Sequence, residues 1–182
     1  MMLFQFIAAA LLICIAHVTP AEEPKKDQKD AGRDLRKMFL TTPPEQFDIQ
    51  PSEDYPRVYG IAMDWPIGEN IATVISLSDG TASVYTTGTF GIIGGIGAES
   101  VRTAAKKLVK EADRHYADSV ATHDLSYPSL DHVRFFLVTF RGVRLIETDL
   151  RSLQEGRGKY ATLFNLAQDV IGQLRMSSEH TK

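Results

Sequence analysis

The residues best suited to binding an anion form a glycine-rich segment just before a predicted helix. Residues 88–99 read GTFGIIGGIGAE, and Ser100 follows as the candidate N-cap of that helix. Backbone N–H groups in such a turn attract anions. Gly94, Gly95, Gly97 and Ser100 are therefore the candidate ligand-binding residues.

The same segment has a simpler interpretation as a site of tight packing. It lacks the glycine spacing of a dinucleotide-binding loop and the Gly-Lys-Ser/Thr of a Walker loop, and Glu99 would repel phosphate. Its apolar side chains are typical of a core, and glycine permits close backbone approach. We favour packing, with anion binding as the alternative.

Basic residues follow the outer side of the same predicted helix. Arg102, Lys106, Lys110 and Arg114 are spaced four residues apart, so they fall on one helix face, here called the basic ridge. The ridge is the candidate partner-binding surface, suited to an acidic protein or an anionic membrane. The alternative is a solvated helix face. No aromatic residues alternate with these bases, which argues against nucleic acid.

Residue types that support catalysis or metal binding are sparse. Asp64 and Glu147 stand near strand ends, where acids either share acid–base roles or form turns. His115, His123 and His132 have aspartates nearby, but their spacings of eight and nine residues match no helical zinc motif. The sequence therefore assigns no catalytic residue, no metal ligand and no cofactor. Asp64, Glu147 and a histidine around one hollow would indicate an enzyme or sensor.

The clearest local element is a hairpin around Asp79-Gly80. Two strand-like runs, 72–78 and 81–87, flank this dipeptide, which is typical of a type I′ turn. That turn predicts one apolar face and one mixed face, with the cross-strand pairs Leu77–Ala82, Ile75–Val84, Ser76–Ser83 and Val74–Tyr85.

Apolar periodicity predicts the remaining elements. Further strands are expected over 58–63, 133–140 and 143–148, the first ending at Asp64-Trp65-Pro66. A short helix over 34–41, with Asp34 as a possible cap, precedes them. Longer helices are expected over 100–116 and 159–175, and Asp149 is a candidate cap for the turn 150–155.

The resulting order, (α)-β-β-β-α-β-β-α, predicts an α+β fold with a five-stranded, largely antiparallel sheet and packed helices. Over residues 34–176 this order resembles the profilin, roadblock and longin type of small α/β sandwich. The strand–DG–strand, Gly-Gly and C-terminal helix segments also resemble uncharacterised bacterial exported proteins. Because roadblock and profilin-like domains mostly bind proteins, the resemblance implies a binding module and supplies no catalytic residue.

The N-terminus is typical of a secretory signal. Residues 3–16 are fourteen nearly all-apolar residues, fewer than the ~20 that span a bilayer. We expect a signal peptide over 1–21 that carries the only cysteine, Cys14, with a cut after Ala16 and an uncleaved membrane anchor as alternatives. A charged stretch over 22–34 predicts a flexible linker, followed by a single domain over 35–178 and a tail over 179–182.

Composition limits the function classes. A chain of 182 residues with 43% apolar residues suits one globular domain, and a net charge of −3 provides no general attraction for nucleic acid. We expect an exported protein, periplasmic or secreted, that acts as a non-catalytic protein-binding or dimerising module. Its partner would be another protein or a second copy, with membrane contact only through an uncleaved leader. The alternative is a small-ligand anion sensor or enzyme that uses the turn at 88–99.

Overall fold

The computed structural model describes residues 28–88, 91–92 and 97–179, and within them the chain forms seven strands and four α-helices. The strands are β1 (Val58–Ile67), β2 (Asn70–Leu77), β3 (Ala82–Thr86), β4 (Gly91–Ile92), β5 (Val120–Ala121), β6 (His132–Thr139) and β7 (Gly142–Asp149). The helices are α1 (Gln28–Thr41), α2 (Glu99–Arg114), α3 (Leu150–Gln154) and α4 (Ala161–Glu179), with 3-10 turns η1 (Pro44–Phe47) and η3 (Tyr116–Asp118).

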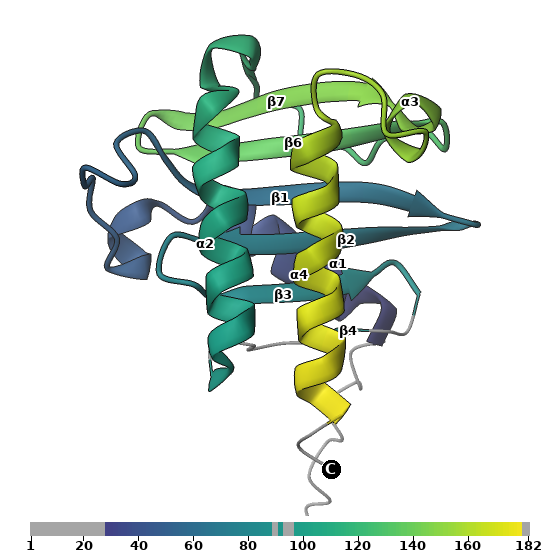
Figure 1. Ribbon diagram of the computed structural model, residues 1–182, viewed down its shortest axis with the longest axis horizontal. Coiled ribbons are helices and arrows are strands. Elements are labelled where there is room, and N and C mark those ends of the chain that lie inside the picture. Colours follow the sequence, from purple (N-terminus) through teal and green to yellow (C-terminus); the bar gives the residue numbers. More distant parts are fainter. Residues whose placement is uncertain (1–27, 89–90, 93–96, 180–182) are drawn as a thin grey trace, which may run out of the picture.

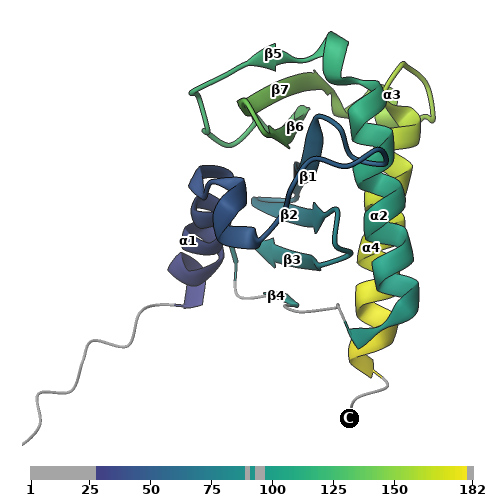
Figure 2. The ribbon, with the colours of Figure 1, turned by 90° about the vertical axis from the view of Figure 1, so that its left-hand side faces the viewer.

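All seven strands join one antiparallel sheet between two layers of helices. The strand order is β4-β3-β2-β1-β6-β7-β5. Helices α2 and α4 lie side by side on one face of this sheet (Figure 1), and α1 lies on the opposite face (Figure 2). We call these two faces the α2/α4 face and the α1 face.

The predicted α+β class and antiparallel sheet are confirmed, but the predicted number of five strands is wrong. The two additional strands, β4 and β5, are each two residues long. A two-residue strand cannot show the alternating pattern by which strands are recognised in a sequence. The sequence therefore predicted the long strands and missed the short outer ones.

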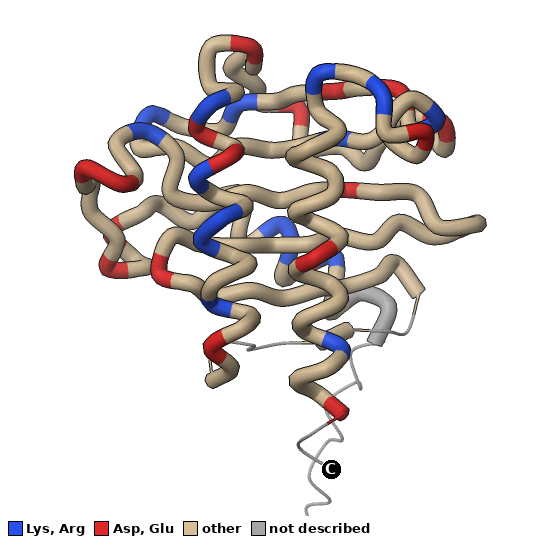
Figure 3. The backbone as a smooth tube through the Cα atoms, viewed as in Figure 1, with Lys and Arg blue, Asp and Glu red and all other residues tan. Residues whose placement is uncertain are grey.

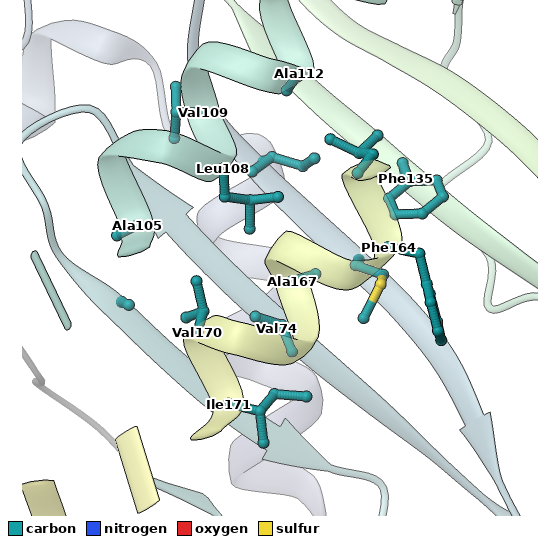
Figure 4. Packing of buried hydrophobic residues seen from close by; sticks show 14 of the residues in the cluster. Val74, Ala105, Leu108, Val109, Ala112, Phe135, Phe164, Ala167, Val170 and Ile171 are labelled. Carbon is teal, nitrogen blue, oxygen red and sulfur yellow. The ribbon is translucent and has the colours of Figure 1, made fainter. Parts of the chain in front are cut away.

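The larger core lies between the sheet and the pair α2 and α4. The helix predicted over 100–116 is observed as α2, and its residues Val101, Leu108 and Ala112 are fully buried. Side chains of α2 and α4, such as Leu108 and Ala167, point onto the sheet in the close view (Figure 4). Burial of this apolar surface is the main driving force for docking the two helices.

A second core lies on the α1 face, where Phe39 and Leu40 of α1 are buried against the sheet. The predicted linker over 22–34 is wrong from residue 28 onward, because α1 begins at Gln28, so Asp34 lies inside the helix and does not cap it. Docking explains the longer helix: Gly32 lies so close to β3 that a Cβ there would meet the Thr86 carbonyl oxygen at 3.1 Å. The charged residues of the predicted linker gave no indication that Gly32 contacts β3.

The β2–β3 register differs from the predicted one by one residue. Because side chains alternate between faces, this slip moves Val84 from the face of Ile75 to the face of Val74. The predicted pairs are therefore wrong, and the observed pairs are Ser76–Ala82, Val74–Val84, Ile75–Ser83 and Thr73–Tyr85.

The turn itself explains the slip. Leu77 N–H donates to the Thr81 carbonyl at 2.9 Å, which makes the loop three residues long. Gly80 has a φ of 98°, whereas Asp79 keeps a negative φ. A type I′ turn needs positive φ at both central residues, so it does not form. Asp79 instead accepts a hydrogen bond from Thr81 N–H at 2.7 Å.

Strand β1 continues beyond the predicted end at Met63. It passes through Asp64, Trp65 and Pro66 to Ile67. Pairing with β6 stops at Asp64, so at Pro66 the strand has only β2 as a neighbour. A proline on such a locally free edge costs no ladder hydrogen bond, which is why it does not end the strand.

The predicted signal peptide over 1–21 and residues 22–27 of the predicted linker lie outside the described residues, as do residues 180–182 of the predicted tail. Among the helices of residues 28–88, 91–92 and 97–179, none combines the length and apolar character needed to cross a bilayer.

Two glycines with positive φ provide a test of how the β2–β3 turn packs against α2. Gly80 (φ 98°) and Gly142 (φ 108°) share the backbone conformation, but an added Cβ meets the Arg102 Cβ at 2.9 Å only at Gly80. We expect Gly142→Ala to lower the free energy of unfolding by ~1–2 kcal/mol through backbone strain alone. Gly80→Ala adds the steric conflict with α2 and should cost clearly more in urea unfolding. Equal losses in the two variants would show that the β2–β3 turn does not pack against α2 in this way.

Candidate functional site

Polar side chains form a row across the α1 face of the sheet, here called the polar row. Consecutive strand pairings place Tyr85, Thr73, Asp64, Arg134 and Glu147 in line on β3, β2, β1, β6 and β7. Directly paired residues in an antiparallel sheet lie on the same face. The fold therefore brings the two candidate acids, Asp64 and Glu147, into one row with Arg134 between them.

Asp64 occupies the centre of the polar row and is fully buried. Arg36, which is itself buried, reaches it from α1 and donates its Nε to the two carboxylate oxygens at 3.0 and 2.9 Å, with a further bond from Nη2. The Thr73 hydroxyl donates to Oδ1 of Asp64 at 2.6 Å. Every polar atom of the carboxylate thus has a partner inside the protein.

Arg36 also fastens the segment between β5 and β6. Its Nη1 donates to the Leu125 carbonyl at 2.8 Å, and Nη2 lies 3.5 Å from the Ser126 carbonyl. Its guanidinium carbon lies 4.2 Å from the ring centroid of Tyr127 and 5.1 Å from that of Phe136. One side chain therefore connects α1, the central strand and the loop 122–131.

The environment of Asp64 indicates an anchor rather than an accessible acid. Burial raises the pKa of the Asp64 carboxyl above its ordinary value, while the hydrogen bonds from Arg36 and Thr73 oppose that rise. A general acid or base must reach the proton that it transfers. With no exposed surface, Asp64 holds the helix and strand together.

Glu147 at the end of the polar row is also held by an arginine. Arg134 Nε donates to Glu147, and its Nη1 donates to Asp124 at 3.1 Å and to the Ser126 hydroxyl at 2.6 Å. Asp124 and Ser126 belong to the loop that Arg36 also binds. The polar row therefore fixes this loop at two points, through Arg36 and Arg134.

The histidines do not gather with these acids. His115 Nδ1 lies 3.3 Å from Asp118, and its ring packs edge-on against Tyr160 at 5.2 Å. His132 Nδ1 lies 2.9 Å from Asp131, whose hydrogen bond raises the pKa of His132. In the part of the chain that the structure describes, no group of three or more His, Cys, Asp or Glu side chains is arranged to hold a metal ion.

The glycine-rich turn is only partly described. Gly94 and Gly95 lie outside the described residues, and a Cβ added at Gly97 would have no neighbour within 4 Å. Ser100 lies inside α2, whose N-cap is Ala98, so the predicted capping role of Ser100 is wrong. Its role in ligand binding stays a prediction, as does that of the glycines.

The basic ridge runs along α2 as a line of basic residues (Figure 3). Three of its four members have carboxylate partners: Arg102 with Glu99, Lys110 with Asp54 at 2.6 Å, and Arg114 with Glu111 at 3.0 Å. Such exposed ion pairs contribute little to stability, but they offset the positive charge of the ridge. A partner-binding role for the ridge stays a prediction.

Two clefts that the sequence did not indicate lie at the end of the sheet, around the β6–β7 hairpin. The first, here called the basic cleft, has a volume of about 200 Å³ and is lined by Pro56, Arg57, Tyr116, Thr139, Phe140 and Arg141. The second, here called the apolar cleft, also measures about 200 Å³ and lies beside the end of α1. Its lining includes Leu40, Pro44, Tyr59, Val138, Phe140 and Val143.

The basic cleft is built around the ring of Tyr116. The guanidinium carbons of Arg57 and Arg144 lie 4.9 and 4.5 Å from its centroid, within the range of cation–π attraction. Arg57 donates to Asp113 at 3.1 Å, and Arg144 donates to the Ser119 hydroxyl at 2.8 Å. Arg141 is exposed at the tip of the hairpin.

Residues from distant parts of the chain form both clefts, which explains why sequence reasoning missed them. The basic cleft combines the segment before β1, the turn after α2 and the β6–β7 hairpin. No short motif links these positions. The sequence offered one indication: Arg141-Gly142 separates the predicted strands 133–140 and 143–148, and so places a basic residue in a turn.

No family model, curated protein or solved structure matches the chain.

Substitutions of the Arg36–Asp64 pair test whether it anchors the fold. Arg36→Met leaves a buried carboxylate, and we expect it to lower the free energy of unfolding by ~3–5 kcal/mol at neutral pH. Without Arg36, burial keeps the pKa of Asp64 in the folded protein above its unfolded value. The loss should therefore be smaller near pH 4 and grow as the pH rises toward 7.

Asp64→Asn is the matched variant, because it removes the titrating carboxyl and the stability of this variant should lack the pH dependence that arises at position 64. The double variant should lose less than the two single variants combined. Urea unfolding at several pH values measures all three. Losses that simply add, with no pH dependence for Arg36→Met, would contradict a buried, coupled pair.

Proposed function

We propose that this chain is an exported, non-catalytic module that binds a protein partner at the β6–β7 end of its sheet. The observation that carries this proposal is the pair of adjoining clefts, which share Thr139 and Phe140. One cleft has a basic and aromatic lining, and the other is mainly apolar. A combination of apolar contact area with arginine and tyrosine is typical of protein-binding surfaces.

The size of the clefts supports recognition of side chains rather than of a whole small molecule. Each measures about 200 Å³, whereas sites for small organic ligands usually measure ~300–1,000 Å³. Two small adjoining clefts suit two side chains of one protein segment. They offer little room for a nucleotide or a cofactor.

The position of the candidate acids supports a binding role over an enzymatic one. Asp64 has no exposed surface, and Glu147 is bonded to Arg134. Neither acid lines the basic or the apolar cleft. The alternative function, an anion sensor or enzyme that uses the turn at 88–99, is favoured by no contact of the described residues.

The export part of the proposal rests on the sequence of residues 1–21, which is typical of a cleaved leader. Removal of residues 1–21 would leave a short charged stretch before α1 begins at Gln28. Before that removal, these charged residues would separate the leader from the folded domain. The element order, with its resemblance to protein-binding domains, favours the same function.

Site-specific photo-crosslinking in the living cell tests the proposal. A photoreactive residue at Arg141, in the basic cleft, should give one discrete and saturable adduct with a partner protein. The matched control is Gln154 on α3, an exposed position at the other end of β7. We expect no adduct there, because the proposed surface lies at the hairpin end.

The mass of the adduct identifies the crosslinked partner, and its N-terminal sequence shows whether the leader has been removed. An adduct of twice the protein's mass identifies a second copy as the partner, and export predicts a chain that starts at Glu22. Adducts of equal yield at positions 141 and 154, or none at either, would contradict a specific protein-binding surface at the hairpin.

A further inference from the structure

We infer that the two clefts recognise a protein segment that carries a carboxylate beside an apolar side chain. This inference rests on the proposed function and names the chemistry of the partner. The carboxylate would occupy the basic cleft, and the apolar side chain would occupy the apolar cleft.

Charge favours an acidic group in the basic cleft. Three guanidinium groups lie in or next to it, those of Arg57, Arg141 and Arg144. Asp113, the partner of Arg57, is the one carboxylate bonded to these three among the described residues. The arginines therefore leave an excess of positive charge, which a carboxylate would complement through charge-assisted hydrogen bonds.

Two of the three arginines, Arg57 and Arg144, are also held in place. Stacking on Tyr116 orients Arg57 and Arg144, and Arg144 is fixed further by the hydroxyl of Ser119. The backbone N–H of Arg141 donates to the Thr139 hydroxyl at 3.1 Å, which fixes the hairpin turn that carries this exposed side chain. Groups that are ordered before binding lose less conformational entropy when a ligand arrives.

The apolar cleft suits an aliphatic or aromatic side chain. Tyr59 and Phe140 stand 5.1 Å apart, centroid to centroid, and form an aromatic part of its lining. Leu40 and Val143 supply aliphatic surface from α1 and β7. No Asp, Glu, Lys or Arg side chain lines this cleft within the described residues. A charged group would therefore lose its hydration there without gaining a partner.

The two clefts are close enough to serve one segment. Thr139 and Phe140 line both, so the clefts adjoin across the last residues before the hairpin turn. Side chains of neighbouring residues in an extended segment point to opposite sides. A segment that crosses the hairpin could therefore place a carboxylate on one side of Phe140 and an apolar side chain on the other.

The basic ridge of α2 is the weaker candidate for the same role. Arg102, Lys110 and Arg114 already have carboxylate partners. In the basic cleft, by contrast, excess positive charge and an adjoining apolar lining occur together. We therefore place the acidic segment at the hairpin.

Titration of the ¹⁵N-labelled full-length chain with short capped peptides tests the inference. The probes are acetyl-Leu-Glu-amide, acetyl-Leu-Gln-amide, acetyl-Ala-Glu-amide and sodium acetate. We expect amide shifts at Tyr116 and over 139–143, with the Leu-Glu peptide binding about three- to fivefold more tightly than the Leu-Gln peptide. The Leu-Glu peptide should also exceed the Ala-Glu peptide by about fivefold, because leucine buries more apolar surface.

Matched variants assign each preference to its cleft. Arg141→Gln should abolish the preference for Glu over Gln, and Val143→Thr should reduce the preference for Leu over Ala. The control is Arg151→Gln, which removes an exposed arginine of α3 far from both clefts and should change neither preference. Intact spectra away from the hairpin show that each variant is folded.

Two outcomes would overturn the inference. If sodium acetate shifts the same amides as strongly as the Leu-Glu peptide, the site binds a carboxylate alone and does not recognise the apolar side chain. Shifts confined to α2, or no shifts at all, would show that the hairpin does not recognise this chemistry. A crosslinked partner at position 141 would still support protein binding in both cases, so the two proposals fail separately.

Discussion

The buried ion pair between Arg36 and Asp64 is the constraint on which the rest of the structure depends. Taking two charges out of water is costly, and the cost is offset only when every remaining polar atom finds a partner. Here Thr73 completes the shell of Asp64, and the carbonyls of Leu125 and Ser126 complete that of Arg36. The same bonds decide where α1 lies and how the loop 122–131 crosses the sheet. Together with the buried Phe39 and Leu40, the pair fixes α1 as a third layer on the face opposite α2 and α4.

The long elements could be predicted from sequence because their apolar spacing is a direct consequence of burial. Helices were expected over 100–116 and 159–175, and within them Leu108 of α2 and Leu174 of α4 lie fully buried in the core. Features set by a single contact could not be read in this way. The register of β2 and β3 depends on whether Asp79 takes a positive φ, and α1 extends to Gln28 because Gly32 meets β3. Each depends on groups that are distant along the chain or on one dihedral angle.

In the candidate site too, some residues were recognisable from local sequence and others came together only through distant contacts. Asp64 was recognisable as an acid near a strand end, but its partner Arg36 lies 28 residues earlier in the short helix predicted over 34–41, and no local spacing links the two residues. The clefts at the β6–β7 hairpin were not recognisable, because Leu40, Tyr116 and Phe140 come together only in the folded chain. Local spacing instead drew attention to the ridge on α2, where carboxylates from neighbouring turns and from Asp54 offset much of the charge. Apolar periodicity in the sequence predicts which residues are buried, but it does not predict which distant residues meet in the folded chain.

The separation of Arg36 from its partners also governs the order of events during synthesis. The carbonyls that Arg36 binds belong to residues 89 and 90 positions further along the chain. A ribosome releases the N-terminus first, so α1 emerges early but cannot lock until the middle strands and the following loop have been made. Closing so large a loop is slow compared with forming a helix. Helix α1 is therefore made well before the loop that binds Arg36, and this bond can form only after that loop has been synthesised.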